Sequence, residues 1–160
     1  MKRRGVILLS GVAVLALLGL GVGLSRASLS ALDEPGRVET YAATKAKHWL
    51  VAREARGPLP PQPRKDSSSA AIGQMQFGGR CASCHGIDGR TPTDVGRWMY
   101  PRAPDLGSPA AQEWSDAELY LIIKHGIRLS GMPGFGKTLS DEDIWHLVHY
   151  VRSIGSAPQS

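Results

Sequence analysis

The longest hydrophobic stretch of the chain lies near its beginning. Residues 5–24 contain no charged side chain, and Lys2, Arg3 and Arg4 precede them. A run of 20 such residues is long enough to cross a bilayer as a helix, and positive charges before it favour a cytoplasmic N-terminus. The pattern predicts a single-pass anchor, residues 1–24, in a bacterial cytoplasmic membrane, with the rest of the chain on the periplasmic side. A cleaved export signal is the alternative, and its apolar core is usually shorter.

Apolar residues at helical spacing predict three helices in the second half of the chain. The first covers residues 71–80. The second follows Ser115, which forms a capping-box pattern with Glu118, and it ends at Gly126. The third covers residues 141–154. The sequence shows no sustained alternation of apolar and polar residues, so the predicted fold is all-α.

The segment between the anchor and these helices is predicted to be a linker, residues 25–68. Its composition predicts a helix over residues 34–56 with a thin apolar stripe. Four prolines then predict an extended spacer, residues 57–65. We expect an exposed helix with Trp49 resting on the folded domain, residues 69–160. Docking of this helix to a partner is the alternative.

The charge of the chain is unevenly distributed. The formal net charge is +5, but residues 1–24 carry three basic side chains and no acidic one. Residues 25–66 carry eight basic and five acidic side chains, whereas residues 67–160 carry eight basic and nine acidic ones. The basic surplus therefore lies outside the folded domain, and no nucleic acid is expected as a partner.

Candidate chemistry is concentrated in the motif Cys81-Ala82-Ser83-Cys84-His85. Two cysteines separated by two residues and followed by histidine form the attachment pattern of a c-type haem. The two thiols add to the vinyl groups of the haem, and the adjacent histidine is held where its ring nitrogen can bind the iron. A thioredoxin-type redox pair would need a βαβ pattern, and a zinc site would need further cysteines. The sequence shows neither.

Five motifs occur in a fixed order along residues 69–160. They are Gly73-x-x-x-Phe77-x-x-x-Cys81, Cys81-Ala82-Ser83-Cys84-His85-Gly86, Pro104-Asp105-Leu106, Gly131-Met132-Pro133-Gly134-Phe135 and Leu147-Val148-His149-Tyr150. Together they resemble a class I cytochrome c, a small single-haem electron carrier. The resemblance implies an all-α fold wrapped around one covalent haem c. It also implies that the Pro104 carbonyl accepts a hydrogen bond from the ligand histidine, and that Leu106 and Phe135 pack on the haem.

The iron needs a second axial ligand besides His85, and the resemblance implies Met132. Met132 lies in a glycine-rich loop that can bring sulfur to iron. Met75 and Met99 are the competing thioethers. We expect Met75 to fill the core and Met99 to pack at the haem rim.

Three histidines of the folded domain are weaker candidates for iron. His125 ends a predicted helix, where a positive side chain complements the helix dipole. His146 and His149 lie off the apolar stripe of the third helix, and we expect them to be solvated.

An imidazole–thioether ligand pair raises the haem potential and occupies both faces of the iron. These features predict a non-enzymatic carrier of single electrons. Its expected partners are membrane-bound or periplasmic redox proteins and, through the anchor, the membrane itself. A haem-based redox sensor and a haem subunit of a larger oxidoreductase are the alternatives.

Overall fold

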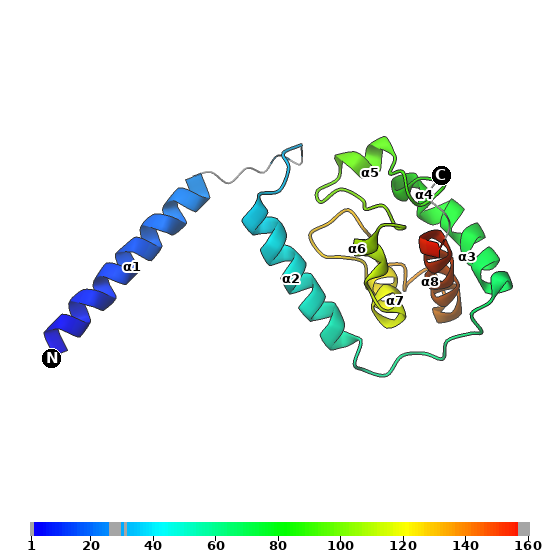
Figure 1. Cartoon of the computed structure of the whole chain (residues 1–160), viewed down its shortest axis with the longest axis horizontal. Helices are drawn as coiled ribbons and strands as arrows, with labels where there is room; N and C mark the ends of the chain where they lie inside the picture. The colour runs from blue at the N-terminus through cyan, green and yellow to red at the C-terminus, as the bar shows by residue number, and fades with distance from the viewer. Residues whose placement is uncertain (1, 26–29, 31, 157–160) are drawn as a thin grey trace. The chain divides into compact units, whose positions relative to one another are not determined.

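The chain forms two compact units, residues 1–33 and 34–160. The structure, a computed structural model, describes residues 2–25, 30 and 32–156, without the side chains of residues 2–10 and 24. The first unit contains helix α1, Lys2–Ser25 (Figure 1). Within this described part of the chain, no helix combines the length and the apolar character needed to cross a membrane. The side chains of residues 1–10 and 24, which belong to the predicted anchor, are not among those that the structure describes.

Three helices form the centre of the second unit and confirm the predicted all-α fold. They are α3, Ser67–Arg80, α7, Asp116–His125, and α8, Asp141–Ser156. α8 lies between α3 and α7 (Figure 1). Apolar side chains from all three helices make up one buried core, and the described residues include no strand.

α3 and α8 approach each other most closely at Gly73. A Cβ atom on Gly73 would lie 2.0 Å from the backbone oxygen of His146, so only glycine leaves room for the crossing. One helical turn later, the Phe77 ring meets the Tyr150 ring edge-on, with 5.1 Å between the ring centres. Because Phe77 is 2% exposed, this crossing is part of the buried core.

Three short helices lie in the connection between α3 and α7. They are α4, Ala82–His85, α5, Asp94–Trp98, and α6, Pro109–Gln112. The side chain of Gln112 donates hydrogen bonds to the carbonyl oxygens of Leu106, at 2.7 Å, and Val151, at 3.0 Å. This long connection is thereby fastened to α8.

Residues 34–66, which we call the strap, belong to the second unit. The strap contains α2, Arg37–Glu54, which lies beside α7 (Figure 1). The ring of His48 stacks on the Trp114 ring, with 3.9 Å between the ring centres, whereas Trp49, which was expected to rest on the domain, is 61% exposed. The compact unit therefore begins at Glu34, whereas the sequence predicts that this segment is a linker ahead of a domain starting at residue 69.

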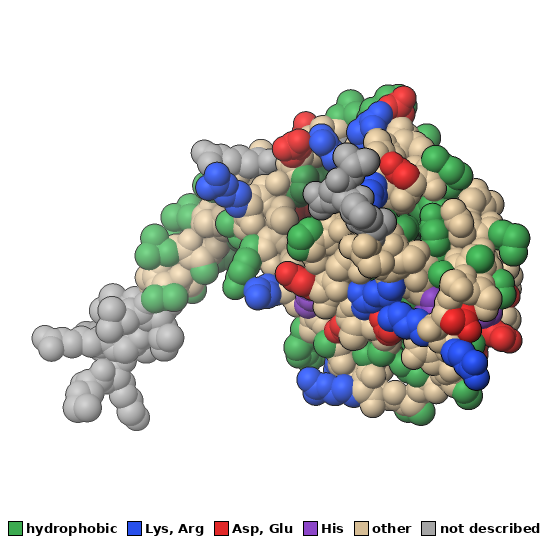
Figure 2. Space-filling model, turned by 45° about the vertical axis from the view of Figure 1, so that its right-hand side comes forward, with side chains coloured by type: hydrophobic (Ala, Val, Ile, Leu, Met, Phe, Trp, Pro, Cys, Tyr) green, Lys and Arg blue, Asp and Glu red, His purple; other side chains and the backbone are tan. Residues whose placement is uncertain are grey.

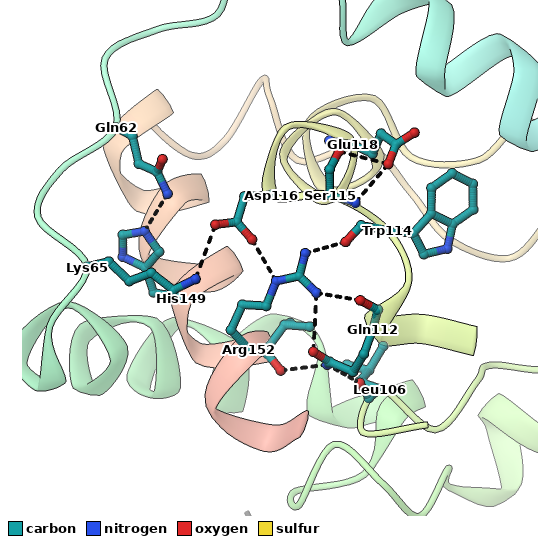
Figure 3. A network of polar contacts seen from close by, with 11 residues as sticks. Gln62, Lys65, Leu106, Gln112, Trp114, Ser115, Asp116, Glu118, His149 and Arg152 are labelled. Atoms are coloured by element: carbon teal, nitrogen blue, oxygen red, sulfur yellow. Dashed lines mark hydrogen bonds and ion pairs between the residues drawn. The ribbon is translucent and has the colours of Figure 1, made fainter. Parts of the chain in front are cut away.

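The proline-rich part of the strap lies against α8 and the start of α7 instead of standing free as a spacer. Three polar contacts hold it, two of which are drawn in Figure 3. They join Trp145 Nε1 to the Pro60 carbonyl oxygen at 3.3 Å, Gln62 Nε2 to His149 Nε2 at 2.9 Å, and Lys65 Nζ to Asp116 Oδ2 at 3.2 Å. Proline composition predicts an extended backbone correctly, but it carries no information about where that backbone docks.

The expectation that His146 and His149 are solvated is wrong. They are 8% and 2% exposed, because the start of α3 and the strap cover this side of α8. The hydroxyl oxygen of Ser69 lies 2.6 Å from His146 Nδ1 and 2.5 Å from His149 Nδ1. Both buried imidazoles are therefore hydrogen-bonded, as buried polar groups must be.

Charged side chains do not gather by sign on the visible face of the molecule. In Figure 2, lysine and arginine side chains are interspersed with aspartate and glutamate side chains. This arrangement agrees with the nearly balanced charge of residues 67–160.

Candidate haem site

The two cysteines and the histidine of the motif lie on a single helical turn. The Cys81 carbonyl oxygen accepts hydrogen bonds from the N–H groups of Cys84 and His85, at 3.1 and 2.9 Å. Because the cysteines are three residues apart in this turn, their side chains lie on the same side. Gly86 ends the turn with a φ of 78°, and a Cβ atom there would lie 2.0 Å from the Thr91 carbonyl oxygen. The motif therefore needs the glycine that follows it.

Residues at the start of α5 contact the haem-attachment motif and hold its helical turn in place. Thr93 donates hydrogen bonds through its hydroxyl to the Ser83 carbonyl oxygen, at 2.7 Å, and through its N–H to that of Cys84, at 3.1 Å. Gly96 lies so close that a Cβ atom on it would be 2.1 Å from the Cys84 carbonyl oxygen. The last carbonyl groups of the turn are thus satisfied, and the turn is held in place.

The Pro104 carbonyl sets the orientation of the His85 ring. His85 Nδ1 lies 3.2 Å from the Pro104 carbonyl oxygen. Since a carbonyl oxygen only accepts, the partner assigns the ring proton to Nδ1 and leaves the lone pair of Nε2 for a metal. Burial lowers the pKa of His85, and the hydrogen bond to Pro104 partly offsets this effect. The ring is therefore held in the neutral form that binds metals.

Met132 lies in a loop that is tied to the end of α7. The N–H of Ile127 donates to the Met132 carbonyl oxygen at 3.2 Å, and that of Phe135 donates to the Ile123 carbonyl oxygen at 3.0 Å. A Cβ atom on Gly134 would lie 2.6 Å from the backbone of the last residue of α7, so the loop approaches the helix without any gap. The Met132 side chain is half-buried against the core.

Most of the predicted haem residues lie at the edge of the core. Half-buried side chains packed against the core include Cys81, Ala82, Leu106, Ile127, Met132 and Phe135, whereas Pro104 is exposed and contributes its carbonyl group. Burial raises the pKa of the Cys81 thiol to about 11. Two thiols on one turn, an imidazole with its Nε2 lone pair available and an apolar border fit a covalent haem. His85 and Met132 are the candidates for its axial ligands, and these two roles stay predictions.

A family model described as cytochrome c oxidase, cbb3-type, subunit III matches residues 68–151. The chain belongs to this family of cytochrome c domains. It is a haem-based electron-transfer cytochrome, and its haem c is bound covalently, with Cys81 and Cys84 at the spacing that attachment requires. The matched residues run from the first turn of α3 into the last turns of α8, so the match contains the whole site described above.

The proteins that are similar to this cytochrome include two curated proteins and a solved structure. The thiosulfate dehydrogenase of Stutzerimonas stutzeri (strain A1501) is 28% identical over 121 residues, which are 70% of this chain and 38% of that protein. The cbb3-type cytochrome c oxidase subunit CcoP of Rubrivivax gelatinosus is 30% identical over 100 residues, 60% of this chain and 29% of that protein. The chain thus spans about a third of the length of these relatives.

The solved structure is a chain of the reducing HAO-like protein complex of Kuenenia stuttgartiensis. It superimposes with a TM-score of 0.54 at 26% identity, over 64% of this chain and 53% of that chain. This similarity agrees with the cytochrome c fold of the second unit.

Some contacts of the cytochrome site were not predicted from the sequence. Met99 packs against the loop of Met132, since a Cβ atom on Gly131 would lie 2.4 Å from the Met99 sulfur. The expectation that Met75 fills the core is wrong, because Met75 is 74% exposed. Gly96 and Ile127 also border the site. The only local signal was the high density of glycines, which indicates close backbone contact without identifying the partner.

Proposed function

We propose that this cytochrome is a non-enzymatic carrier of single electrons, attached to the outer side of a bacterial cytoplasmic membrane through residues 1–24. Its donors and acceptors are membrane-bound or periplasmic redox proteins. The family match and the haem motif support electron transfer. The uncharged run of residues 5–24 behind three basic residues supports export and anchoring.

The observation that carries the proposal is the fixed orientation of the His85 ring by the Pro104 carbonyl oxygen, at 3.2 Å. When bound, haem supplies one-electron oxidation and reduction at its iron. The Pro104 carbonyl holds the proton on His85 Nδ1, so Nε2 would be free to bind the iron in either oxidation state. The hydrogen bonds at both ends of the Met132 loop limit its movement. A site whose ligands stay in place rearranges little on electron transfer, which is what a carrier requires.

Met132→Ala tests the proposal. In the parent, the ferric protein is expected to show the weak charge-transfer band of sulfur-ligated haem, and the reduced protein is expected not to bind carbon monoxide. In the variant, the haem stays attached through Cys81 and Cys84, but the band disappears, carbon monoxide binds and the reduction potential falls. Met99→Leu is the matched control and should keep the band. A parent that lacks the band and binds carbon monoxide would favour the redox sensor instead.

A second candidate is a haem subunit of a larger oxidoreductase. Two similar proteins favour it: one is described as an oxidase subunit and the other comes from a protein complex. Gentle solubilisation of membranes distinguishes the two. A subunit co-purifies with a partner in fixed ratio, whereas a carrier is recovered alone.

A further inference from the structure

Helix α2 has two faces of different chemistry. Its inner face includes His48, stacked on Trp114, and Val51, packed against the core. The opposite side of the helix, which we call the outer face, is exposed, with Val38 at 83% and Trp49 at 61%. The outer face consists of residues at helical spacing: Val38, Ala42, Lys45, Trp49 and Arg53.

The acidic side chains of this segment are occupied by the cytochrome domain. Residues 34–56 contain three acidic side chains and five basic ones. Each acidic side chain meets a partner from a loop or helix end near the haem site. Glu34 pairs with Arg102 at 3.0 Å, Glu39 accepts from the Tyr100 hydroxyl, and Glu54 lies 3.4 Å from His125 Nε2. The three carboxylates are therefore paired with the domain, although Glu34 and Glu54 stay exposed, and Lys47 turns inward over the Trp114 ring. Lys45 and Arg53 remain on the outer face.

The outward cations lie over aromatic rings. Lys45 Nζ is 5.7 Å from the centre of the Tyr41 ring, and the Arg53 guanidinium is 4.9 Å from that of Trp49.

We propose that the outer face of α2 docks on the surface of a bilayer that contains anionic phospholipids, with Lys45 and Arg53 at the lipid phosphates. Aromatic rings and cations on one helix face match the zone between headgroups and acyl chains. The position of α2 in the chain also favours lipid. Only the 12 residues 25–36 separate it from the predicted anchor, a reach of at most about 40 Å. The proposal extends the membrane attachment proposed above and gives the haem domain a second contact with the bilayer.

A nitroxide label on the full-length holoprotein in lipid nanodiscs tests the docking. Cys81 and Cys84 are bonded to haem, so Ala42→Cys supplies one free thiol on the outer face without removing a charge. Ala71→Cys on α3 is the matched control, because α2 and α3 lie on opposite sides of the second unit (Figure 1). Discs of phosphatidylcholine alone are compared with discs that also contain phosphatidylglycerol. Collisions of the label with oxygen and with a water-soluble nickel chelate report its immersion.

We expect the label at residue 42 to gain oxygen collisions and lose nickel collisions only in the discs with phosphatidylglycerol, while the label at residue 71 stays in water. Each cation near an anionic surface contributes roughly a fivefold preference, so adding K45E and R53E should reduce the immersed population roughly 25-fold or more. Immersion at residue 42 in both discs, or in neither, would overturn the proposal. If the chain does not insert into the discs, the proposed membrane anchor is wrong, and this result does not bear on the docking of α2. The same label then reports binding to added phosphatidylglycerol vesicles, and no immersion there overturns the docking.

Discussion

The α3–α8 junction and the strap both cover α8, but they do so by different means. At the junction, two backbones meet at Gly73 with no room for a Cβ atom. The strap reaches α8 through single polar contacts, such as those of Pro60 and Gln62. Close packing does not tolerate added volume, whereas polar contacts near the surface are lost one at a time and at small cost. Substitutions should therefore have large effects at the junction and graded ones in the strap.

The largest effect is expected for Gly73→Ala. The added methyl group would lie 2.0 Å from the His146 carbonyl oxygen and 2.9 Å from Tyr150 Cβ, so the two helices must move apart. We expect the free energy of unfolding to fall by about 3 kcal/mol, at the upper end of what overpacking costs. Guanidinium titration of the holoprotein, followed by circular dichroism, measures the change.

Gly78→Ala is the matched control on the same helix. A Cβ atom there meets nothing within 4 Å, so replacing this helical glycine should raise the free energy of unfolding by roughly 0.5–1 kcal/mol. If both variants shifted stability equally, the junction would not be the tight contact described here.

Ser69→Ala is expected to have the next largest effect, because Ser69 lies where the junction and the strap meet. Its hydroxyl is hydrogen-bonded to both His146 and His149, and it is 3% exposed. Removing it leaves imidazole nitrogens buried without a partner, which costs about 1–3 kcal/mol. The exposed Ser67 is the control, and Ser67→Ala should change the unfolding free energy by less than about 0.5 kcal/mol.

Ser69 also illustrates what the sequence could and could not predict. The haem motif and the helices of the core follow from local patterns, and the structure has them. The burial of His146 and His149 depends on residues 77 and 80 positions away in the chain. Helical spacing assigned both histidines to the polar side of α8, but spacing cannot show that another segment covers that side.

The docking of the strap on the domain could not be predicted for the same physical reason. Its helix was expected at residues 34–56 and is found at Arg37–Glu54, so local composition located it well. Its docking depends on the stacking of His48 on Trp114 and on a hydrogen bond from Trp145 to Pro60. Neither contact leaves a periodic signal in the sequence.

A smaller, pH-dependent effect is expected at His149, the point where the strap touches the buried histidines. Burial has the largest effect and lowers the pKa of His149. Lys65 and His146 lower it as well, whereas Asp116 and Asp66 raise it. The folded-state pKa therefore lies below 6.5, the ordinary value. As the pH falls below about 6.5, the unfolded chain binds a proton first, so the stabilisation from neutral His149 is present above that pH and is lost below it.

The expected slope of the unfolding free energy is at most about 1.4 kcal/mol per pH unit. His149→Asn keeps a side chain that can hydrogen-bond Ser69 but cannot titrate, so it should flatten the profile just below pH 6.5. The lowered pKa values of Asp66 and Asp116 act in a separate window, below about pH 4. An unchanged profile in the variant would mean that His149 is not the titrating group.

The smallest effect is expected for Glu34→Gln, at the start of the strap. Its ion pair with Arg102 spans 3.0 Å, but the two side chains are 76% and 59% exposed, so water and salt screen the attraction. We expect a loss of less than about 0.5 kcal/mol, which disappears at high salt. A double-mutant cycle with Arg102→Gln isolates the pair, because each single variant removes the charge while keeping a side chain of similar polarity. A coupling energy above about 1 kcal/mol would show that this end of the strap is held as firmly as the junction, and the contrast between the two regions would then fail.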